Sequence, residues 1–296
     1  MNKKISVVLP VYNGEKRIKT AIESITSQTY TNIQIIIVND CSQDNTLQIV
    51  EKCAKEDNRI EIINNEHNQK LPKSLNIGFK AASGDYLTWT SDDNTYHRDA
   101  LKTMAEFLDN SKENDLVYTD FSKFDMNGKI QKMKLNGPDD IRFVNTVGAC
   151  FLYRKSLANK IGEYDPELFL AEDYEYWIRA YLSGNIHHLS IDLYNYALHD
   201  KSLTTTRVKE VRKQTFNAKN KHFDALLDRC NSQKDRNRFF HEMLVLLDDP
   251  GDLQQFRNIY YEMDSNFAKI DKVRRSVSSV YHFSANLVKG MMKKNR

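Results

Sequence analysis

The chain has 296 residues, 40% of them hydrophobic, and a net charge of only +3 at pH 7. This composition is ample for a packed core, and no apolar run reaches the roughly 18 residues that a membrane-spanning helix needs. A nucleic-acid-binding protein is excluded as the leading class, because the body is mildly acidic and no nucleic-acid-binding module is recognisable. The four cysteines are scattered, and a strand-like sequence, KKISVVLPV, stands where a signal peptide would lie, so we expect a cytoplasmic protein.

The first half of the chain alternates strand and helix patterns. Near-continuous apolar runs predict strands at residues 5–11 and 33–40, and shorter runs predict strands at 60–64 and 86–90. Helical periodicity fills the gaps between them. This alternation predicts an α/β fold with a mostly parallel sheet covered by helices on both faces. In such sheets the ligand crevice lies beyond the carboxyl ends of the strands, and polar clusters occur there in this sequence.

The pattern changes after residue 115. Residues 116–135 predict two strands around an Asn-Gly turn and residues 147–155 predict another strand, which makes the sheet mixed. Residues 171–182 carry apolar side chains at helical spacing, with two acids at the start. From residue 208 the chain is predicted to be helical, with a break at DDPGD. We therefore divide it into a main domain, 1–207, and a helical C-terminal region, 208–296.

Two adjacent carboxylates, Asp92 and Asp93, follow the predicted strand at 86–90. Like charges side by side raise each other's pKa, so we expect a cation beside them. Carboxylates just past a strand end commonly hold Mg²⁺ or Mn²⁺ against substrate phosphates, although a plain turn is the alternative. Neither G-x-G-x-x-G nor a P-loop sequence occurs at a strand end, so a metal is expected to neutralise the phosphates.

Polar residues also follow the first two strands. Asp40 and Asp44 come after the second strand, where an Asp either caps the next helix or accepts hydrogen bonds from a base or ribose. Capping suits Asp44 better than Asp40. Tyr12 and Asn13 follow the first strand and either pack within a loop or provide a platform for a planar ring.

Two further candidates lie in the second half. Asp173 falls in the first turn of the helix predicted at 171–182, where the macrodipole favours the ionised form and keeps it available as a base near neutral pH. Dipole complementation alone would also explain an acid there, and Glu172 could serve either role. His199 is either a metal ligand or a hydrogen-bonded surface histidine.

Three stretches, taken in order, carry a family resemblance: ISVVLPVYNGEKRIKTAIESITSQTYTNIQIIIVNDCSQDNT, GDYLTWTSDDN and AEDYEYWIRA. They resemble the GT-A family 2 glycosyltransferases over about the first 200 residues. The resemblance implies a GT-A fold and an inverting transfer of a sugar from a nucleotide diphosphate donor, usually with Mn²⁺ or Mg²⁺. UDP is the nucleotide that the family most often uses. The implied partners are the nucleotide-sugar donor and a glycan or lipid-linked glycan acceptor, as in the assembly of bacterial surface polysaccharide or glycoconjugates.

The resemblance also implies roles for single residues. Asp40 matches the acid that contacts the base, and Asp92 lies near the ribose and the metal. Asp93 matches the metal ligand of the D-x-D-type element, and His199, in an H-x-x-S stretch, matches a metal or phosphate contact. Asp173 matches the catalytic base. The nucleobase pocket is lined by the family's P-x-Y-N stretch, here Pro10, Val11, Tyr12 and Asn13.

The sequence departs from the family pattern at several positions. Asn39 and Cys41 replace an Asp and a Gly, Thr90 stands where many members carry an Asp, and Leu75 stands where many carry an Arg. Thr90 and Leu75 mildly support an alternative function, a catalytically silent module of the same fold that binds a nucleotide-sugar or a glycan. The four intact acids, Asp40, Asp92, Asp93 and Asp173, argue against it.

The C-terminal tail is basic. After Asp271 it holds seven Lys or Arg and no acid, with apolar residues at near-helical spacing. It either packs on the body as a terminal helix or lies on a membrane surface, which would place the enzyme peripherally on the inner face of the plasma membrane near a lipid-linked acceptor.

Overall fold

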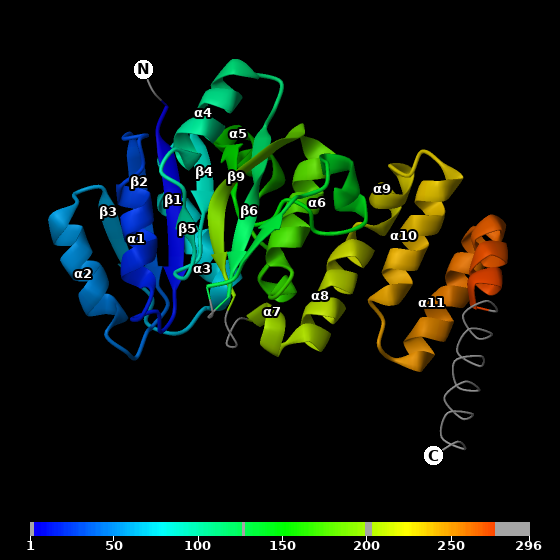
Figure 1. The fold of residues 1–296 in the computed structure, drawn as a ribbon. Helices are drawn as coiled ribbons and strands as arrows, with labels where there is room; N and C mark the ends of the chain where they lie inside the picture. Colours follow the sequence, from blue (N-terminus) through cyan, green and yellow to red (C-terminus); the bar gives the residue numbers. More distant parts are fainter. Residues whose placement is uncertain (1–2, 126–127, 199–202, 276–296) are drawn as a thin grey trace, which may run out of the picture. The chain divides into compact units, whose positions relative to one another are not determined.

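The computed structural model describes residues 3–125, 128–198 and 203–275 (Figure 1). The chain forms two compact units, Met1–His222 and Phe223–Arg296. The division therefore falls one helix later than the domain boundary set at residue 207 from the sequence. The reason is that α8 (Val208–Lys221) packs against α6 (Glu172–Ser183) within the first unit.

One mixed sheet forms the centre of the first unit. Its described strands run in the order β3-β2-β1-β4-β8-β6-β9-β5, and β7 pairs with β6. The first four neighbours are parallel, whereas β8 joins β4 and β6 antiparallel. The predicted α/β fold is confirmed. The strands are β1 (Ile5–Val11), β2 (Ile33–Asn39), β3 (Ile60–Asn64), β4 (Tyr86–Trp89), β5 (Thr95–Tyr96), β6 (Leu116–Phe124), β7 (Ile130–Met133), β8 (Phe151–Arg154) and β9 (Ile186–Ala197).

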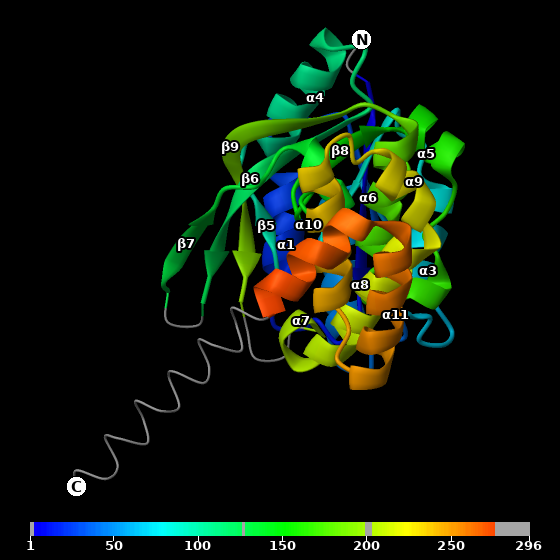
Figure 2. The same cartoon turned by 90° about the vertical axis from the view of Figure 1, so that its right-hand side faces the viewer.

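Helices cover both faces of this sheet, and Figure 2 shows α1 and α3 on opposite sides of it. Val7 and Leu9 of β1 pack in one core cluster with residues of α1, α2 and α4. Val8 faces the other way, against Gly78 of α3, where an added Cβ would lie 2.4 Å from Val8 Cγ1. The helices are α1 (Ile18–Thr26), α2 (Thr46–Glu56), α3 (Lys70–Ala81), α4 (Ala100–Asn110), α5 (Lys155–Ile161), α6, α7 (Leu203–Thr206) and α8, with short 3₁₀ helices at Pro138–Arg142 and Pro166–Leu168.

The strand register brings three loops to one edge. Val11 at the end of β1 pairs with Asn39 at the end of β2, and Val8 pairs with Trp89 at the end of β4. Because these strands are parallel, the segments that follow them leave the sheet on the same side. The sequence predicts the ligand crevice at this edge.

Two strands were not predicted from the sequence. β9 has only Tyr194 fully buried, so its sequence, IHHLSIDLYNYA, lacks a clear apolar alternation. Its register with β6 shifts between Thr119 and Ser122, which further disrupts a simple pattern. β5 has two residues and depends on its pairing with β9.

The second unit is helical. It contains α9 (Phe223–Asp228), α10 (Gln233–Val245) and α11 (Pro250–Met263), and residues 265–275 are also helical. Asp249, in the predicted break, caps α11 by accepting hydrogen bonds from the next backbone N–H groups. This confirms the C-terminal helical appendage, whereas most of the basic tail lies outside the described residues. The core of the second unit is an aromatic cluster of Phe223, Phe239, Phe240, Tyr260 and Phe267.

In the described part of the chain, no helix combines the length and the apolar character that crossing a bilayer requires.

Candidate active site

The loop after β1 is tied to the loop after β2. Pro10 and Val11 are buried in β1, whereas the Tyr12 side chain is 51% exposed at the edge of the sheet. The backbone N–H of Asn13 donates to Ser42 Oγ at 3.0 Å, and Asn13 Oδ1 accepts from the N–H of Gln43 at 2.8 Å. The four residues predicted to line a nucleobase pocket therefore lead from β1 into a loop that is hydrogen-bonded to the loop after β2, and this loop exposes the Tyr12 ring.

The Asp40 carboxylate caps α3. Its Oδ1 accepts from Asn65 Nδ2 and from the N–H of Gln69, both at 2.8 Å, and its Oδ2 accepts from the N–H of Lys70 at 3.0 Å. From the sequence we considered a cap only for α2, the next helix in the chain, and Asp44 does cap α2 by accepting from the N–H of Thr46. A carboxylate offers about four acceptor positions, so these three hydrogen bonds leave one position of Asp40 unused, in a residue that is 4% exposed.

The paired carboxylates lie in a turn between β4 and β5. Asp92 and Asp93 are both partly exposed. A Cβ added to Gly14 would lie 2.4 Å from Asp92 Oδ2, so the missing side chain lets the β1 loop approach Asp92 closely. Asn94 Oδ1 accepts from the N–H of Ala197 at 2.9 Å, which holds this turn beside the end of β9. The loops after β1 and β4 therefore meet at Asp92.

The donor set fits a hard divalent cation. Carboxylate oxygens suit Mg²⁺ and Mn²⁺, and Mg²⁺ usually binds one or two carboxylates together with substrate phosphates rather than a full protein cage. In residues 3–125, 128–198 and 203–275, no three His, Cys, Asp or Glu side chains are grouped as metal ligands. The two adjacent carboxylates of Asp92 and Asp93 match that mode of binding. His199 lies outside the described residues.

Asp173 lies at the start of α6, as predicted, and is partly exposed. Its Oδ1 accepts from the N–H of Tyr174 at 2.7 Å, and its Oδ2 accepts from Asn145 Nδ2 at 3.0 Å. Trp89 at the end of β4 donates through Nε1 to the Tyr164 hydroxyl at 3.0 Å, and the Tyr164 ring stacks on Tyr176 of α6 with the ring centres 4.0 Å apart. The start of α6 is therefore connected to the strand that leads into Asp92.

Burial dominates the electrostatics of the acidic pair at the start of α6. Glu172 is 5% exposed and accepts from the N–H of Leu170 at 2.7 Å. Burial and the charge of Asp173 raise the pKa of Glu172 to about 8. Burial also raises the pKa of Asp173, against the hydrogen bonds from Tyr174 and Asn145 that lower it. The macrodipole, from which we expected an ionised Asp173, is thus not the largest influence on this pair.

The raised pKa of Glu172 predicts how stability changes with pH. The folded state holds this proton more tightly than the unfolded chain, so stability is lost as pH rises from the unfolded value of 4.5 toward 8. Gln mimics the protonated acid. Relative to Glu172→Gln, the wild type should lose up to about 1.4 kcal/mol per pH unit in this window, measured by urea unfolding. The difference in unfolding free energy between the wild type and the exposed control Glu163→Gln should not change over this pH range. If the difference for Glu172→Gln is also constant, the claim that Glu172 is buried with a raised pKa is contradicted.

Backbone strain gathers at the same edge. Among the described residues, four non-glycine residues have positive φ: Asn13 (54°), Cys41 (63°), Lys70 (64°) and Leu170 (82°). Each such residue costs about 1–3 kcal/mol and persists only where the surrounding structure enforces it. Asn13 and Cys41 follow β1 and β2, Lys70 is the first residue of α3, and Leu170 lies just before α6. Strain concentrated in this way is typical of a functional site.

Comparison with known proteins matches this arrangement to one family. Residues 6–166 match the model of the family described as Glycosyl transferase family 2. The chain belongs to this family. The matched stretch includes Asp40, Asp92 and Asp93 and ends before Asp173.

The relatives of this chain include named bacterial glycosyltransferases. The chain is 33% identical over 204 residues to poly(ribitol-phosphate) beta-N-acetylglucosaminyltransferase TarS of Staphylococcus aureus, which covers 66% of this chain and 35% of that protein. It thus spans only about a third of the length of this curated relative. A further relative, glycosyltransferase GlyG of Streptococcus pneumoniae, is 32% identical over 125 residues, 42% of this chain and 41% of that protein.

Solved structures share the GT-A fold. Residues 1–349 of S. aureus TarS, in complex with UDP-GlcNAc, superpose with a TM-score of 0.61 and 22% identity, covering 82% of this chain and 80% of that one. The mannosyltransferase PcManGT of Pyrobaculum calidifontis, in complex with GDP-Man and Mn²⁺, gives a TM-score of 0.62 at 13% identity, covering 94% and 81%. The GT-A fold predicted from the sequence is therefore confirmed.

Sequence reasoning missed several residues of this family 2 site. Asn145, which donates a hydrogen bond to Asp173, lies in a loop that carries no sequence motif. Tyr164 can be assigned to the site only from its hydrogen bond with Trp89 in the folded protein. Lys70 could have been noticed, because it follows Asn68 and Gln69 in a polar loop beside a predicted strand end. Its positive φ, however, is a property of the folded backbone alone.

Proposed function

We propose that the protein is an inverting glycosyltransferase that moves a sugar from a nucleotide diphosphate donor, a UDP-hexose or UDP-N-acetylhexosamine, to an acceptor hydroxyl. One observation carries the proposal. The loops after β1 and β4 meet at Asp92, beside Asp93, and the Trp89–Tyr164 hydrogen bond together with the Tyr164–Tyr176 stack connects β4 to α6, whose first turn carries Asp173. In this proposal Asp92 and Asp93 would hold the metal, and Asp173, whose pKa burial raises, would act as the base; these are the two functions that a single displacement needs.

The donor side consists of the β1 and β2 loops and the β4–β5 turn. Tyr12 offers an exposed ring for the base, Asn13 braces its loop, and Asp40 keeps one acceptor position for the nucleoside. Asp93, together with Asp92, would hold Mn²⁺ or Mg²⁺, and His199 is a proposed further ligand. The cation, when bound, supplies positive charge against the negative charge that develops on the leaving diphosphate.

The acceptor side depends on Asp173. Its carboxylate takes the proton of the acceptor hydroxyl as that oxygen forms a bond to the anomeric carbon and the bond to the diphosphate oxygen breaks. Attack from the face opposite the leaving group inverts the configuration. Asn145 and the N–H of Tyr174 hold the two carboxylate oxygens in place, which keeps the base oriented during this step.

The relatives support UDP and a surface glycan as the setting. TarS carries UDP-GlcNAc in its solved structure and by name modifies poly(ribitol-phosphate). We extend this to synthesis of a bacterial surface polysaccharide or glycoconjugate at the inner face of the membrane, with the basic tail as a peripheral contact. Peripheral binding remains a proposal, since most of the tail lies outside the described residues.

Calorimetry with nucleoside diphosphates tests the donor assignment. UDP, GDP and dTDP, together with CMP, are titrated into the full chain with Mn²⁺, with Mg²⁺ or with EDTA. We expect UDP to bind in the presence of metal and to bind at least about tenfold more weakly in EDTA, which corresponds to ~1.4 kcal/mol. Binding of none of the four nucleotides would contradict the proposed function.

A further inference from the structure

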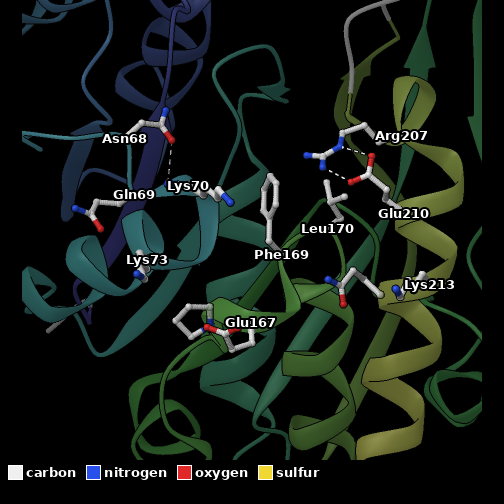
Figure 3. Close-up of a pocket in the computed structure, with 12 residues that line it drawn as sticks. Asn68, Gln69, Lys70, Lys73, Glu167, Phe169, Leu170, Arg207, Glu210 and Lys213 are labelled. Atoms are coloured by element: carbon white, nitrogen blue, oxygen red, sulfur yellow. Dashed lines mark hydrogen bonds and ion pairs between the residues drawn. The ribbon is translucent and has the colours of Figure 1, made fainter.

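A cavity of about 540 Å³ lies beside the candidate active site within the first unit (Figure 3). It opens between the start of α3, residues 166–170 and the first two turns of α8. Four cationic side chains contribute to its lining, Lys70, Lys73, Arg207 and Lys213, against two acids, Glu167 and Glu210. The volume is within the usual range of small-molecule sites.

Most of this positive charge is not neutralised by the protein. Arg207 is paired with Glu210. For Lys70, Lys73 and Lys213, no carboxylate in the described part of the chain lies within the 4.0 Å of an ion pair. Like charges that share a cavity disfavour one another, and an anion bound between them relieves the repulsion. The chemistry of the lining therefore selects an anionic ligand.

Phe169 positions two of these cations. Lys70 Nζ lies 5.6 Å from the centre of its ring, and so does the Arg207 guanidinium carbon. Figure 3 shows the ring between these two side chains. Cation–π contacts of this length hold charged groups in place without neutralising them. Both cations are thus kept at the cavity, Lys70 without a carboxylate partner and Arg207 paired with Glu210.

The backbone around the cavity is strained in two places. Lys70 and Leu170, which both line the cavity, have positive φ values of 64° and 82°. Glycine adopts this conformation at no steric cost, so a lysine here is disfavoured by its own backbone. A side chain kept at such a position is expected to have a function there.

The position of the cavity indicates which substrate it serves. Leu170 leads directly to Glu172 and donates its N–H to that side chain. Asp92 and Asp93 are proposed to hold the metal ion that binds the donor diphosphate, and neither of them lines the cavity. At Gln69 and Lys70 the cavity also adjoins Asp40, whose carboxylate accepts from both backbone N–H groups. Because the proposed metal ligands are not part of the lining, we assign the cavity to the acceptor, whose hydroxyl must reach Asp173.

We propose that this cavity binds a phosphate ester carried by the acceptor. Lysine ammonium groups supply point charges to the phosphate oxygens, and the guanidinium of Arg207 can shift from Glu210 to a phosphate. The assignment to the acceptor rests on the proposed transferase function, whereas the anion site itself does not. The acceptor of this enzyme is, on this account, a phosphate-bearing molecule.

The test uses glycerol 3-phosphate as the probe and glycerol as the uncharged control, titrated calorimetrically into the full chain. The wild type should bind the phosphate ester and not glycerol. Lys70→Gly and Lys213→Gln should each bind roughly tenfold more weakly. Lys209→Gln, an exposed lysine of α8 outside the cavity lining, should bind like the wild type. Absence of phosphate binding, or equal affinity in all variants, would overturn the proposal.

Two further measurements separate the alternatives. Lys70→Gly restores the residue that its φ favours, so its thermal midpoint should not fall, and a lost affinity then cannot be attributed to unfolding. Saturating UDP should leave glycerol 3-phosphate binding unchanged; displacement by UDP would mean that the cavity holds the donor diphosphate and would overturn the assignment to the acceptor. If no nucleotide binds but the phosphate ester does, the transferase proposal fails and the anion site remains.

Discussion

Replacing Asp173 by Asn should lower the transfer rate by about 10²–10⁴-fold, the usual contribution of a general base. An amide cannot accept the acceptor proton, although it is close in size to the carboxylate and can still accept one of the two hydrogen bonds from Asn145 and Tyr174. Donor affinity should stay within about twofold, because Asp173 is proposed to act on the acceptor. The rate is measured as formation of glycosylated acceptor and the affinity by calorimetry with UDP.

Glu163→Gln is the matched control for Asp173→Asn. Glu163 is exposed and lies in the segment that leads to α6, so its loss of charge should leave transfer near the wild-type rate. A transfer rate in Asp173→Asn equal to that of the control would remove Asp173 from the role of base. A loss of UDP affinity equal to the loss of rate would mean that Asp173 acts on the donor instead.

Glu175→Gln should destabilise the first unit by about 3–5 kcal/mol, the cost of removing one partner from a buried ion pair. The Glu175 side chain is 0% exposed and accepts from Arg179, from Lys221 at 3.2 Å and from His222 at 2.8 Å. The variant would leave these cations without their shared carboxylate. Because Lys221 and His222 end α8, the loss should also loosen that helix.

The effect of Glu175→Gln should depend on pH. Burial would raise the pKa of Glu175, but the hydrogen bonds from His222 and Arg179 outweigh it and lower the pKa to about 2. A carboxyl with a lowered folded pKa stabilises above its unfolded pKa of 4.5, and this stability is lost as pH falls toward 2. The wild type and the variant should therefore converge in urea unfolding between pH 5 and pH 2.

An exposed pair with the same i, i+4 spacing provides the control. Lys19 and Glu23 lie 3.6 Å apart with side chains 64% and 60% exposed, so Glu23→Gln should change stability by less than about 0.5 kcal/mol. If Glu175→Gln and Glu23→Gln lower the free energy of unfolding by the same small amount, the claim that Glu175 is the shared partner of a stabilising buried network is contradicted.

The fold could be predicted where burial leaves a regular pattern in the sequence. Every residue of β1 and β2 is buried, which is why both read as continuous apolar runs. Ile18, Ala21, Ile22 and Ile25 of α1 are buried at helical spacing. β9 has a single fully buried residue and follows no such pattern.

The site could be predicted only in part, because several of its properties depend on contacts between distant segments. The sequence indicated a cap for Asp44, whose partner is two residues away. It could not indicate that Asp40 caps α3, whose N–H groups come from residues 69 and 70. The adjacency of Glu172 and Asp173 was visible, but the burial that raises the pKa of both was not. The cation-lined cavity likewise exists only because α3 and α8 come together.

The most direct test of the account is the release of nucleoside diphosphate from UDP-sugars without acceptor, in Mn²⁺ and in EDTA. The wild type, Asp93→Ala and the control Glu51→Ala, an exposed acid on α2, are compared. We expect slow hydrolysis of one UDP-sugar in Mn²⁺ by the wild type and by Glu51→Ala. EDTA and Asp93→Ala should each reduce this rate by at least about 10²-fold. Hydrolysis that persists in Asp93→Ala at the wild-type rate would contradict the assignment of the metal and donor phosphates to the Asp92–Asp93 turn.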